Sequence, residues 1–269
     1  MLTRHLSPAR IFILSFAGVI LAGAILLWLP FASTREIRFV DALFMSASAV
    51  CVTGLATVDV GTDLTTAGQI VLICLFQVGG LGILTFSAFL FGIMGRGISF
   101  KGREIVQSSF LHTPRRDFFV ILKSVIVSTL IIESAGMLLL FVRFVQEFPA
   151  STALYYAVFH AISAFNNCGF SLFPDSFVRY QGDLLFNLTV MMLIILGGIG
   201  FVVHHEVFAR LRDRNARLSL HSRIVLVTTA GLIAAGAALF WLFEDGYILK
   251  GLSPQTQLLV SLFQSITPR

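Results

Sequence analysis

Two stretches of this sequence decide its fold, because they repeat each other: DALFMSASAVCVTGL at residues 41–55 and YAVFHAISAFNNCGF at residues 156–170. Aligned on Gly54 and Gly169, they share a phenylalanine, a serine and an alanine at matching positions. Each stretch is too short to cross a bilayer, which takes about 20 apolar residues, and each lies between two longer apolar segments. A short helix ending in glycine between two spans is typical of a pore loop. The pattern therefore indicates ion passage, and we expect no enzyme.

The composition fits a chain that lies mostly in lipid. Hydrophobic residues make up 57% of it and charged residues 12%, against about 25% charged in a soluble domain. We predict an all-α, multi-pass membrane protein. Its five spans are expected at 11–30, 67–94, 117–143, 183–209 and 222–243, and its short helices at 41–50, 153–165 and 255–266.

The net charge of +5 does not indicate nucleic acid, because the basic residues follow the predicted loops. Most of the 19 Lys and Arg lie in the N-terminus and in two segments, 96–116 and 210–223. Positive charge stays on the cytoplasmic side of a membrane. The N-terminus is therefore predicted inside, and the loops 31–68, 144–182 and 244–257 outside.

A second repeat lies in the helix that follows each loop. Glycine clusters stand at Gly79-Gly80-Leu81-Gly82 and at Gly197-Gly198-Ile199-Gly200. Such clusters let helix backbones approach closely in lipid. A dinucleotide fingerprint is excluded, because no strand precedes either cluster.

The chemistry of the loops points to a cation. A cation that crosses hydrocarbon must exchange its water for other oxygens, and rings of backbone carbonyls supply them. Successive carbonyls line one path only if some residues take positive φ, which glycine adopts cheaply. The C-terminal end of each short helix carries partial negative charge, which favours a cation nearby.

Three motifs carry a resemblance to a known family: VCVTGL at 50–55, QVGGLG at 77–82 and HAISAFNNCGFS at 160–171. They are similar to the Trk/Ktr/HKT superfamily of potassium transporters, and most of all to its Ktr-type branch. The resemblance covers essentially the whole chain. It implies a potassium-channel-like pore of four membrane–pore–membrane repeats in a homodimer, with K⁺ as the transported ion.

The resemblance also implies partners and site residues. It implies a bacterial inner-membrane location, contact with membrane lipid and a cytosolic ring of regulatory subunits; these subunits, not this chain, would bind nucleotide. An activating role for Na⁺ stays open. The filter residues that it implies are Val50, Cys51, Val52, Thr53, Gly54, Phe165, Asn166, Asn167, Cys168 and Gly169, with no catalytic residue and no other metal site.

The repeats are expected at 1–100, 101–216 and 217–269, the third being partial. In the family, the motif at 263–269 is followed by another filter glycine, so the chain is expected to be a fragment of a longer transporter. Glycine at position 54 favours potassium, since serine there accompanies sodium transport in the plant branch. The alternatives are transport of another monovalent cation, Na⁺-permeable or Na⁺-coupled, and a fragment that does not conduct.

Some polar residues keep two interpretations each. Glu133, in the middle of the third span, either supports the second pore loop or a cation, or serves as a structural partner for a buried polar group. Asp59, Asp63 and Asp175 either concentrate cations at the pore mouth or are solvated loop residues. The basic segments 96–116 and 210–214 bind either the regulatory ring or anionic lipid.

Overall fold

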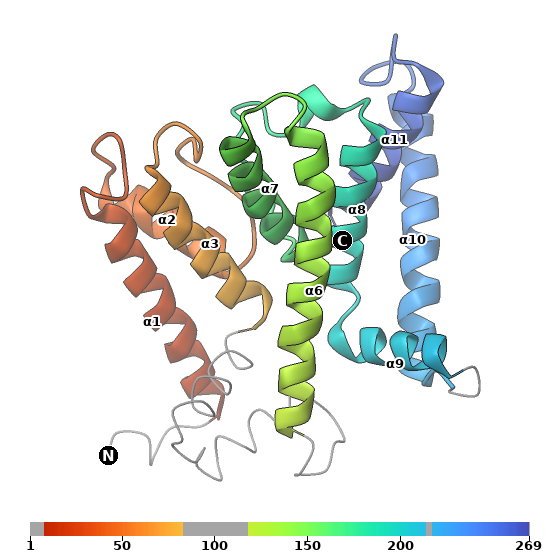
Figure 1. Cartoon of the computed structure of the whole chain (residues 1–269), viewed down its shortest axis with the longest axis horizontal. Coiled ribbons are helices and arrows are strands. Elements are labelled where there is room, and N and C mark those ends of the chain that lie inside the picture. Colours follow the sequence, from red (N-terminus) through yellow and green to blue (C-terminus); the bar gives the residue numbers. More distant parts are fainter. Residues whose placement is uncertain (1–7, 83–117, 214–216, 269) are drawn as a thin grey trace. The chain divides into compact units, whose positions relative to one another are not determined.

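The chain is helical throughout the part that its computed structural model describes, residues 8–82, 118–213 and 217–268 (Figure 1). This confirms the predicted all-α class. Within these residues, Lys123–Phe144 and Leu220–Glu244 are long and apolar enough to cross a membrane. The residues form two compact units, Met1–Ile131 with Cys168–Pro174 and Ile132–Asn167 with Asp175–Arg269. Each unit is described by itself below.

The first unit contains α1 (Pro8–Trp28), α2 (Phe39–Val50) and α3 (Thr66–Gly80). The short helix α2 is anchored to α1 by the Ser46 hydroxyl, which donates to the carbonyl of Ile20 at 2.7 Å. Gly23, one turn along α1, makes room for this contact, because a Cβ there would collide with the serine oxygen. Thr65 caps α3 by accepting from the N–H of Gly68.

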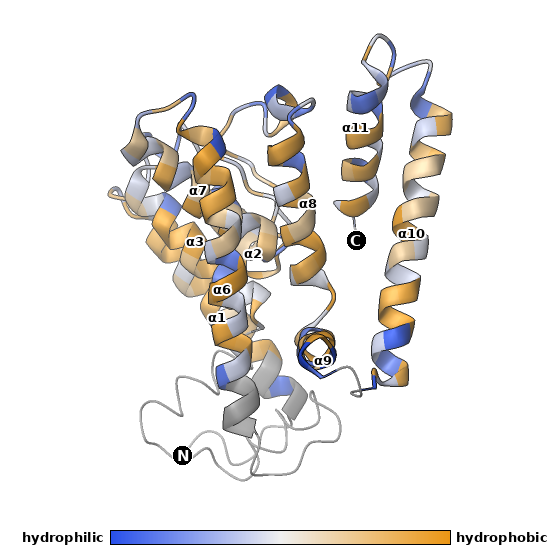
Figure 2. Ribbon diagram, turned by 45° about the vertical axis from the view of Figure 1, so that its right-hand side comes forward, coloured by the Kyte–Doolittle hydropathy of each residue, from blue (hydrophilic) through white to orange (hydrophobic). Residues whose placement is uncertain are grey.

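The second unit continues from α6 (Phe118–Phe144), which both units share. Its other helices are α7 (Ala150–Phe165), the 3₁₀ turn η2 (Val178–Tyr180), α8 (Leu184–Gly198), α9 (Phe201–Arg212), α10 (Leu220–Glu244) and α11 (Pro254–Ile266). Figure 2 shows apolar residues along the length of α10 and α8, with hydrophilic residues gathered towards the helix ends. This distribution is that of helices in a bilayer.

The pair α10 and α11 repeats the contact seen between α1 and α2. The Ser265 hydroxyl of the short helix α11 donates to the carbonyl of Ile233 in α10 at 2.9 Å. A Cβ at Gly236, again one turn along the longer helix, would collide with the serine oxygen. The same serine anchor thus recurs on a second pair of a long and a short helix.

The predicted fourth span, 183–209, is wrong as one continuous helix. The structure divides it into α8 and α9, which are bent by 107° at a break of two residues. The break lies in the second glycine cluster, where Gly200 has φ 85°. A right-handed helix cannot continue through that conformation. The second predicted span, 67–94, is described only to Gly82, and the basic segment 96–116 lies outside the described residues.

Replacing Gly200 by alanine should lower stability. Among the described residues no atom beyond its chain neighbours lies within 4 Å of a Cβ added there, so it is the backbone conformation that opposes a side chain. We expect a loss of about 1 kcal/mol, since positive φ costs an L-residue roughly that much. Gly231 in α10 is the matched control: it also has open surroundings but lies within a helix, so Gly231→Ala should be neutral or stabilising. Thermal unfolding in detergent measures both; equal stability of Gly200→Ala and wild type would contradict the account.

Candidate functional site: the two pore loops

The first loop begins where α2 ends, at Val50. Cys51 caps the helix, and the backbone then turns sharply, with Val52 at φ 58° and Gly54 at φ 73°. Thr53 fastens this turn to the helix: its N–H donates to the Ser48 carbonyl at 2.9 Å, and its hydroxyl donates to the Ser48 hydroxyl at 2.9 Å. The chain therefore leaves the helix axis within two residues of its end.

The second loop has the same backbone. Helix α7 ends at Phe165, Asn166 caps it, Asn167 has φ 56° and Gly169 has φ 80°. Positive φ thus recurs two and four residues after the end of each short helix. Since positive φ is uncommon outside glycine, its recurrence at a valine and an asparagine shows that the two loops share one conformation.

The two loops meet at their glycines within the first unit. A Cβ at Gly54 would collide with the carbonyl oxygen of Cys168 and lie 3.2 Å from the Cα of Gly169. The Cys168 side chain is buried, with its Sγ 4.0 Å from the carbonyl oxygen of Ala49, while the Cys51 side chain is exposed. The structure therefore brings together two residues that are 115 positions apart in sequence and were predicted to share one site.

A glycine of each cluster lies against the backbone at the start of one loop. A Cβ at Gly79 would collide with the carbonyl oxygen of Val50, the last residue of α2. A Cβ at Gly197 would collide with the carbonyl oxygen of Phe165, the last residue of α7. In both repeats of the sequence, the close approach predicted from the glycine cluster is made to the residue at which the loop begins.

The side chain of Asn167 ties the second loop to α8. With its amide nitrogen directed at α8, it donates to the carbonyl of Ile194 at 3.1 Å and its oxygen accepts from the N–H of Gly198 at 3.3 Å. This orientation is the one that satisfies both amide atoms. The Asn167 side chain is therefore engaged with the backbone of α8.

Two carboxylates in the segment between α2 and α3, Asp59 and Asp63, form hydrogen bonds within that segment and with Arg35. Asp63 accepts from Arg35 at 2.5 Å and from the N–H of Asp59 at 2.9 Å. Asp59 in turn accepts from the N–H groups of Gly61 and Thr62. These contacts favour a structural role for both residues over the concentration of cations.

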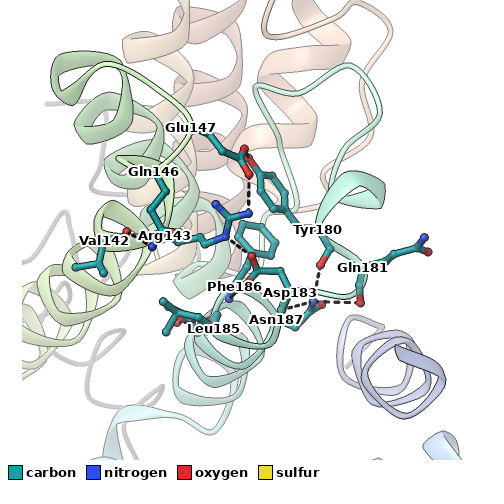
Figure 3. Close-up of polar contacts among 11 residues, drawn as sticks. Val142, Arg143, Gln146, Glu147, Tyr180, Gln181, Asp183, Leu185, Phe186 and Asn187 are labelled. Atoms are coloured by element: carbon teal, nitrogen blue, oxygen red, sulfur yellow. Dashed lines mark hydrogen bonds and ion pairs between the residues drawn. The ribbon is translucent and has the colours of Figure 1, made fainter. Parts of the chain in front are cut away.

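A polar cluster joins the end of α6 to η2 and to the start of α8 (Figure 3). Arg143, near the end of α6, is hydrogen-bonded to Asp183, the N-cap of α8, and donates to Glu147 at 2.5 Å. The hydroxyl of Tyr180 donates to the other oxygen of Glu147 at 2.9 Å. Burial, together with the hydrogen bond to Glu147, raises the pKa of Tyr180. The cluster thus fixes the end of the segment that follows the second loop, Tyr180 and Asp183, to the end of α6.

Neutralising Glu147 should make this cluster weaker, and only above acidic pH. Burial opposes its ionisation, but hydrogen bonds from Arg143 and Tyr180 hold its pKa below the ordinary value of 4.5. The carboxylate therefore stabilises the fold above that value, and the contribution is lost as pH falls through the lowered pKa. Glu147→Gln should cost under about 1 kcal/mol at neutral pH, because the side chain is partly exposed.

Unfolding of wild type and Glu147→Gln across pH tests this expectation, with Glu36→Gln on an exposed loop as the control. The difference between wild type and Glu147→Gln should shrink towards acid. A difference that grows towards acid would contradict the assignment.

Residues that the structure describes include no group of three or more His, Cys, Asp or Glu placed to hold a metal ion. The neighbouring His204, His205 and Glu206 of α9 do not converge: His205 is exposed, and Glu206 accepts from the N–H of Ser219 at 2.8 Å.

Comparison with known proteins identifies a family. The sequence profile of TrkH, described as cation transport protein, matches residues 8–266. The chain is 38% identical over 262 residues to the Ktr system potassium uptake protein B of Vibrio alginolyticus, covering 97% of this chain and 58% of that protein. It is 38% identical over 265 residues to the protein of the same name from Bacillus subtilis (strain 168), covering 98% and 59%.

Two further comparisons agree. The potassium/sodium uptake protein NtpJ of Enterococcus hirae is 33% identical over 269 residues, covering 99% of this chain and 59% of that protein. The crystal structure of the potassium transporter TrkH from Vibrio parahaemolyticus has a TM-score of 0.67 at 20% identity, covering 99% of this chain and 51% of that one. The chain thus spans little more than half the length of these relatives.

Proposed function

The chain belongs to the TrkH family of cation transport proteins, and from that premise we propose that it forms part of the pore of a potassium uptake protein. Membership confirms the expectation of a membrane transport protein rather than an enzyme. The observation that carries the proposal is the meeting of two loops of one conformation at Gly54 and Cys168–Gly169. Relatives named for potassium uptake support K⁺ as the ion.

The proposed filter consists of backbone carbonyls from the two loops. None of the ten predicted residues, 50–54 and 165–169, carries a charge, so selectivity would come from carbonyl oxygens that replace the hydration shell of the ion. Each loop follows the C-terminal end of a short helix, where partial negative charge favours a cation. We propose that K⁺ moves passively along this path, down its electrochemical gradient.

The wider architecture is part of the same proposal. The repeats would lie at 1–100, 101–216 and 217–269, with the N-terminus in the cytoplasm of a bacterial cell and the loops entering from outside. The working protein would be a homodimer bound to a cytosolic ring of nucleotide-binding subunits. Support comes from the shared loop backbone, from the repeated serine anchor of α2 and α11, and from relatives named as parts of a Ktr system.

Rubidium uptake tests the function. The gene, with its reading frame continued as far as it runs, is expressed in bacteria that lack potassium uptake, and ⁸⁶Rb⁺ entry is measured with K⁺ or Na⁺ as competitor. We expect uptake that K⁺ inhibits at lower concentration than Na⁺. Equal inhibition by both ions would favour the Na⁺-permeable alternative, and stimulation by Na⁺ would favour Na⁺ as an activator or coupled ion. Absence of uptake in cells that contain the protein would contradict the proposal.

A further inference from the structure

A buried carboxyl group lies beside the second loop. Glu133 is in the middle of α6 and its residue is 6% exposed. An ionisable side chain in a membrane span is expensive, so it is retained only where other groups compensate for its burial. The residues that Glu133 contacts therefore indicate its role.

Glu133 contacts Asn166, the residue that caps the short helix of the second loop. The side-chain nitrogen of Asn166 donates to Oε1 of Glu133 at 3.3 Å and to the carbonyl of Ile162 at 2.9 Å. These two bonds occupy both hydrogens of the amide nitrogen. The Asn166 side chain thus links the last turn of α7 to α6, and Asn166 is itself 5% exposed.

The position of Asn166 makes this link important for the loop. Asn166 stands between the last helical residue and Asn167, whose φ of 56° begins the turn towards Gly169. Asn167 is tied to α8, as described above. The beginning of the second loop is therefore held on two sides, by α6 through Asn166 and by α8 through Asn167.

The first loop lacks this attachment. Cys51 stands at the position of Asn166, its side chain is exposed, and α1 contains no Asp or Glu. The first loop is held instead by the bonds between Thr53 and Ser48. The carboxyl–amide link is thus a special feature of the second repeat and not a requirement of the shared backbone.

We propose that Glu133 is a positioning residue of the second pore loop, and that it acts by accepting a hydrogen bond from the Asn166 side chain. Of the two interpretations of Glu133 given above, this one is support for the second pore loop. The hydrogen bond to a buried polar group is the means by which Glu133 provides that support. It rests on the proposed function only in that the positioned loop is a filter. In this role Glu133 acts through Asn166 and not by binding the ion.

The role depends on an acceptor oxygen, not on charge. Glu133→Gln retains an oxygen at the same reach and should preserve the link. Glu133→Leu removes the acceptor and leaves a buried amide donor without it, a loss large enough to change the occupancy of the ordered loop about tenfold. Asn166→Leu removes the donor and should have the same effect.

Thiol labelling tests the link without depending on transport. Cys168 is buried next to the loop glycines, so its reaction with a small maleimide reports opening of the loop. The purified protein from the continued reading frame is labelled, and mass spectrometry of peptides separates Cys168 from the exposed Cys51 and Cys74. Labelling of Cys168 should be about tenfold faster in Glu133→Leu and Asn166→Leu, and unchanged in Glu133→Gln.

Two comparisons make the test specific. The double variant should label no faster than either single variant, because both remove one interaction. Thr129→Val, one turn earlier on α6, is the control: Thr129 is buried, and its hydroxyl has no hydrogen-bond partner among the described residues. It should label like wild type.

Ion discrimination provides the second readout. In the rubidium assay, the ratio of the Na⁺ and K⁺ concentrations that inhibit uptake does not depend on the amount of protein, and it should fall in Glu133→Leu but not in Glu133→Gln. Unchanged labelling and unchanged discrimination in Glu133→Leu would overturn the proposal. So would a Glu133→Gln variant that behaves like Glu133→Leu, or a double variant whose effects add. Lack of uptake by wild type would contradict the proposed function alone, since labelling would still decide the role of Glu133.

Discussion

Replacing Gly54 by serine is expected to abolish selective potassium uptake, with a loss of about a hundredfold per molecule. Two effects add at this position. The φ of 73° opposes any side chain, and a Cβ would collide with the carbonyl oxygen of Cys168 in the opposite loop. The substitution therefore disturbs both loops at their point of contact, while the helices that carry them are unaffected.

The measurement is ⁸⁶Rb⁺ uptake, normalised to the amount of protein in the membrane. Gly18→Ser in α1 is the matched control, because among the described residues, its own helix backbone apart, no atom lies within 4 Å of a Cβ added there. It should transport like wild type. If Gly54→Ser also did so, with wild-type preference for K⁺ over Na⁺, Gly54 would not be part of a filter.

Substitution of Gly197 by alanine should have the second largest effect, although the residue lies in α8 and not in a loop. Its Cβ would collide with the carbonyl oxygen of Phe165 and lie 2.7 Å from the carbonyl carbon. Two backbones cannot separate at this point without moving the start of the second loop. Overpacking of this kind costs about 1–3 kcal/mol, so we expect roughly a tenfold loss of uptake and a lower unfolding temperature.

The neighbouring Gly198 is a sharp control for this prediction. A Cβ at Gly198 would meet only the side-chain amide group of Asn167, at 3.3 Å, and a side chain can shift where a backbone cannot. Gly198→Ala should therefore keep most of the uptake. Equal uptake and equal unfolding temperatures for the two alanine variants would contradict this account. They would show that Gly197 is not needed for the close packing of α8 against the start of the second loop.

The positions of the short helices could be predicted because local signals mark them. The first two lie between longer apolar segments and are followed by glycine at a fixed distance; α2 and α7 begin within three residues of the predicted starts. The two glycine-ended loops could be predicted for the same reason. Glycines 54 and 169 occupy positions of positive φ in both loops, as expected.

Sequence analysis did not predict which residues other than glycine would have positive φ in these loops. Val52 and Asn167 also have positive φ, and a β-branched valine normally avoids it. Bonds from outside the residue hold the conformation, such as those of Thr53 to Ser48 in the first loop. These hydrogen bonds depend on how the folded chain places Thr53 next to the last turn of α2. Composition and periodicity therefore do not predict them.

The bend between α8 and α9 was missed for a different reason. Residues 183–209 form an apolar stretch of spanning length, so hydropathy favours one helix. The deciding feature is the conformation of a single residue, Gly200, and glycine is also common inside membrane helices. Only its φ of 85° separates a helix break from close packing, and φ is not encoded in the pattern of apolar residues.

The partner of Glu133 was likewise beyond the sequence. Its burial and cost could be anticipated from its place in an apolar helix. The partner, Asn166, is 33 residues away, and nothing in the spacing selects it over other polar residues of the second repeat. Tertiary packing of α6 against the end of α7 decides the pair.

Anomalous diffraction from crystals of the complete protein grown in rubidium is the most direct test that the two loops form a cation filter. The account predicts a rubidium peak within coordination distance of backbone carbonyls of both glycine-ended loops, and its disappearance in Gly54→Ser. Rubidium bound only to side-chain carboxylates away from residues 50–54 and 165–169, in a protein that takes up rubidium, would contradict it.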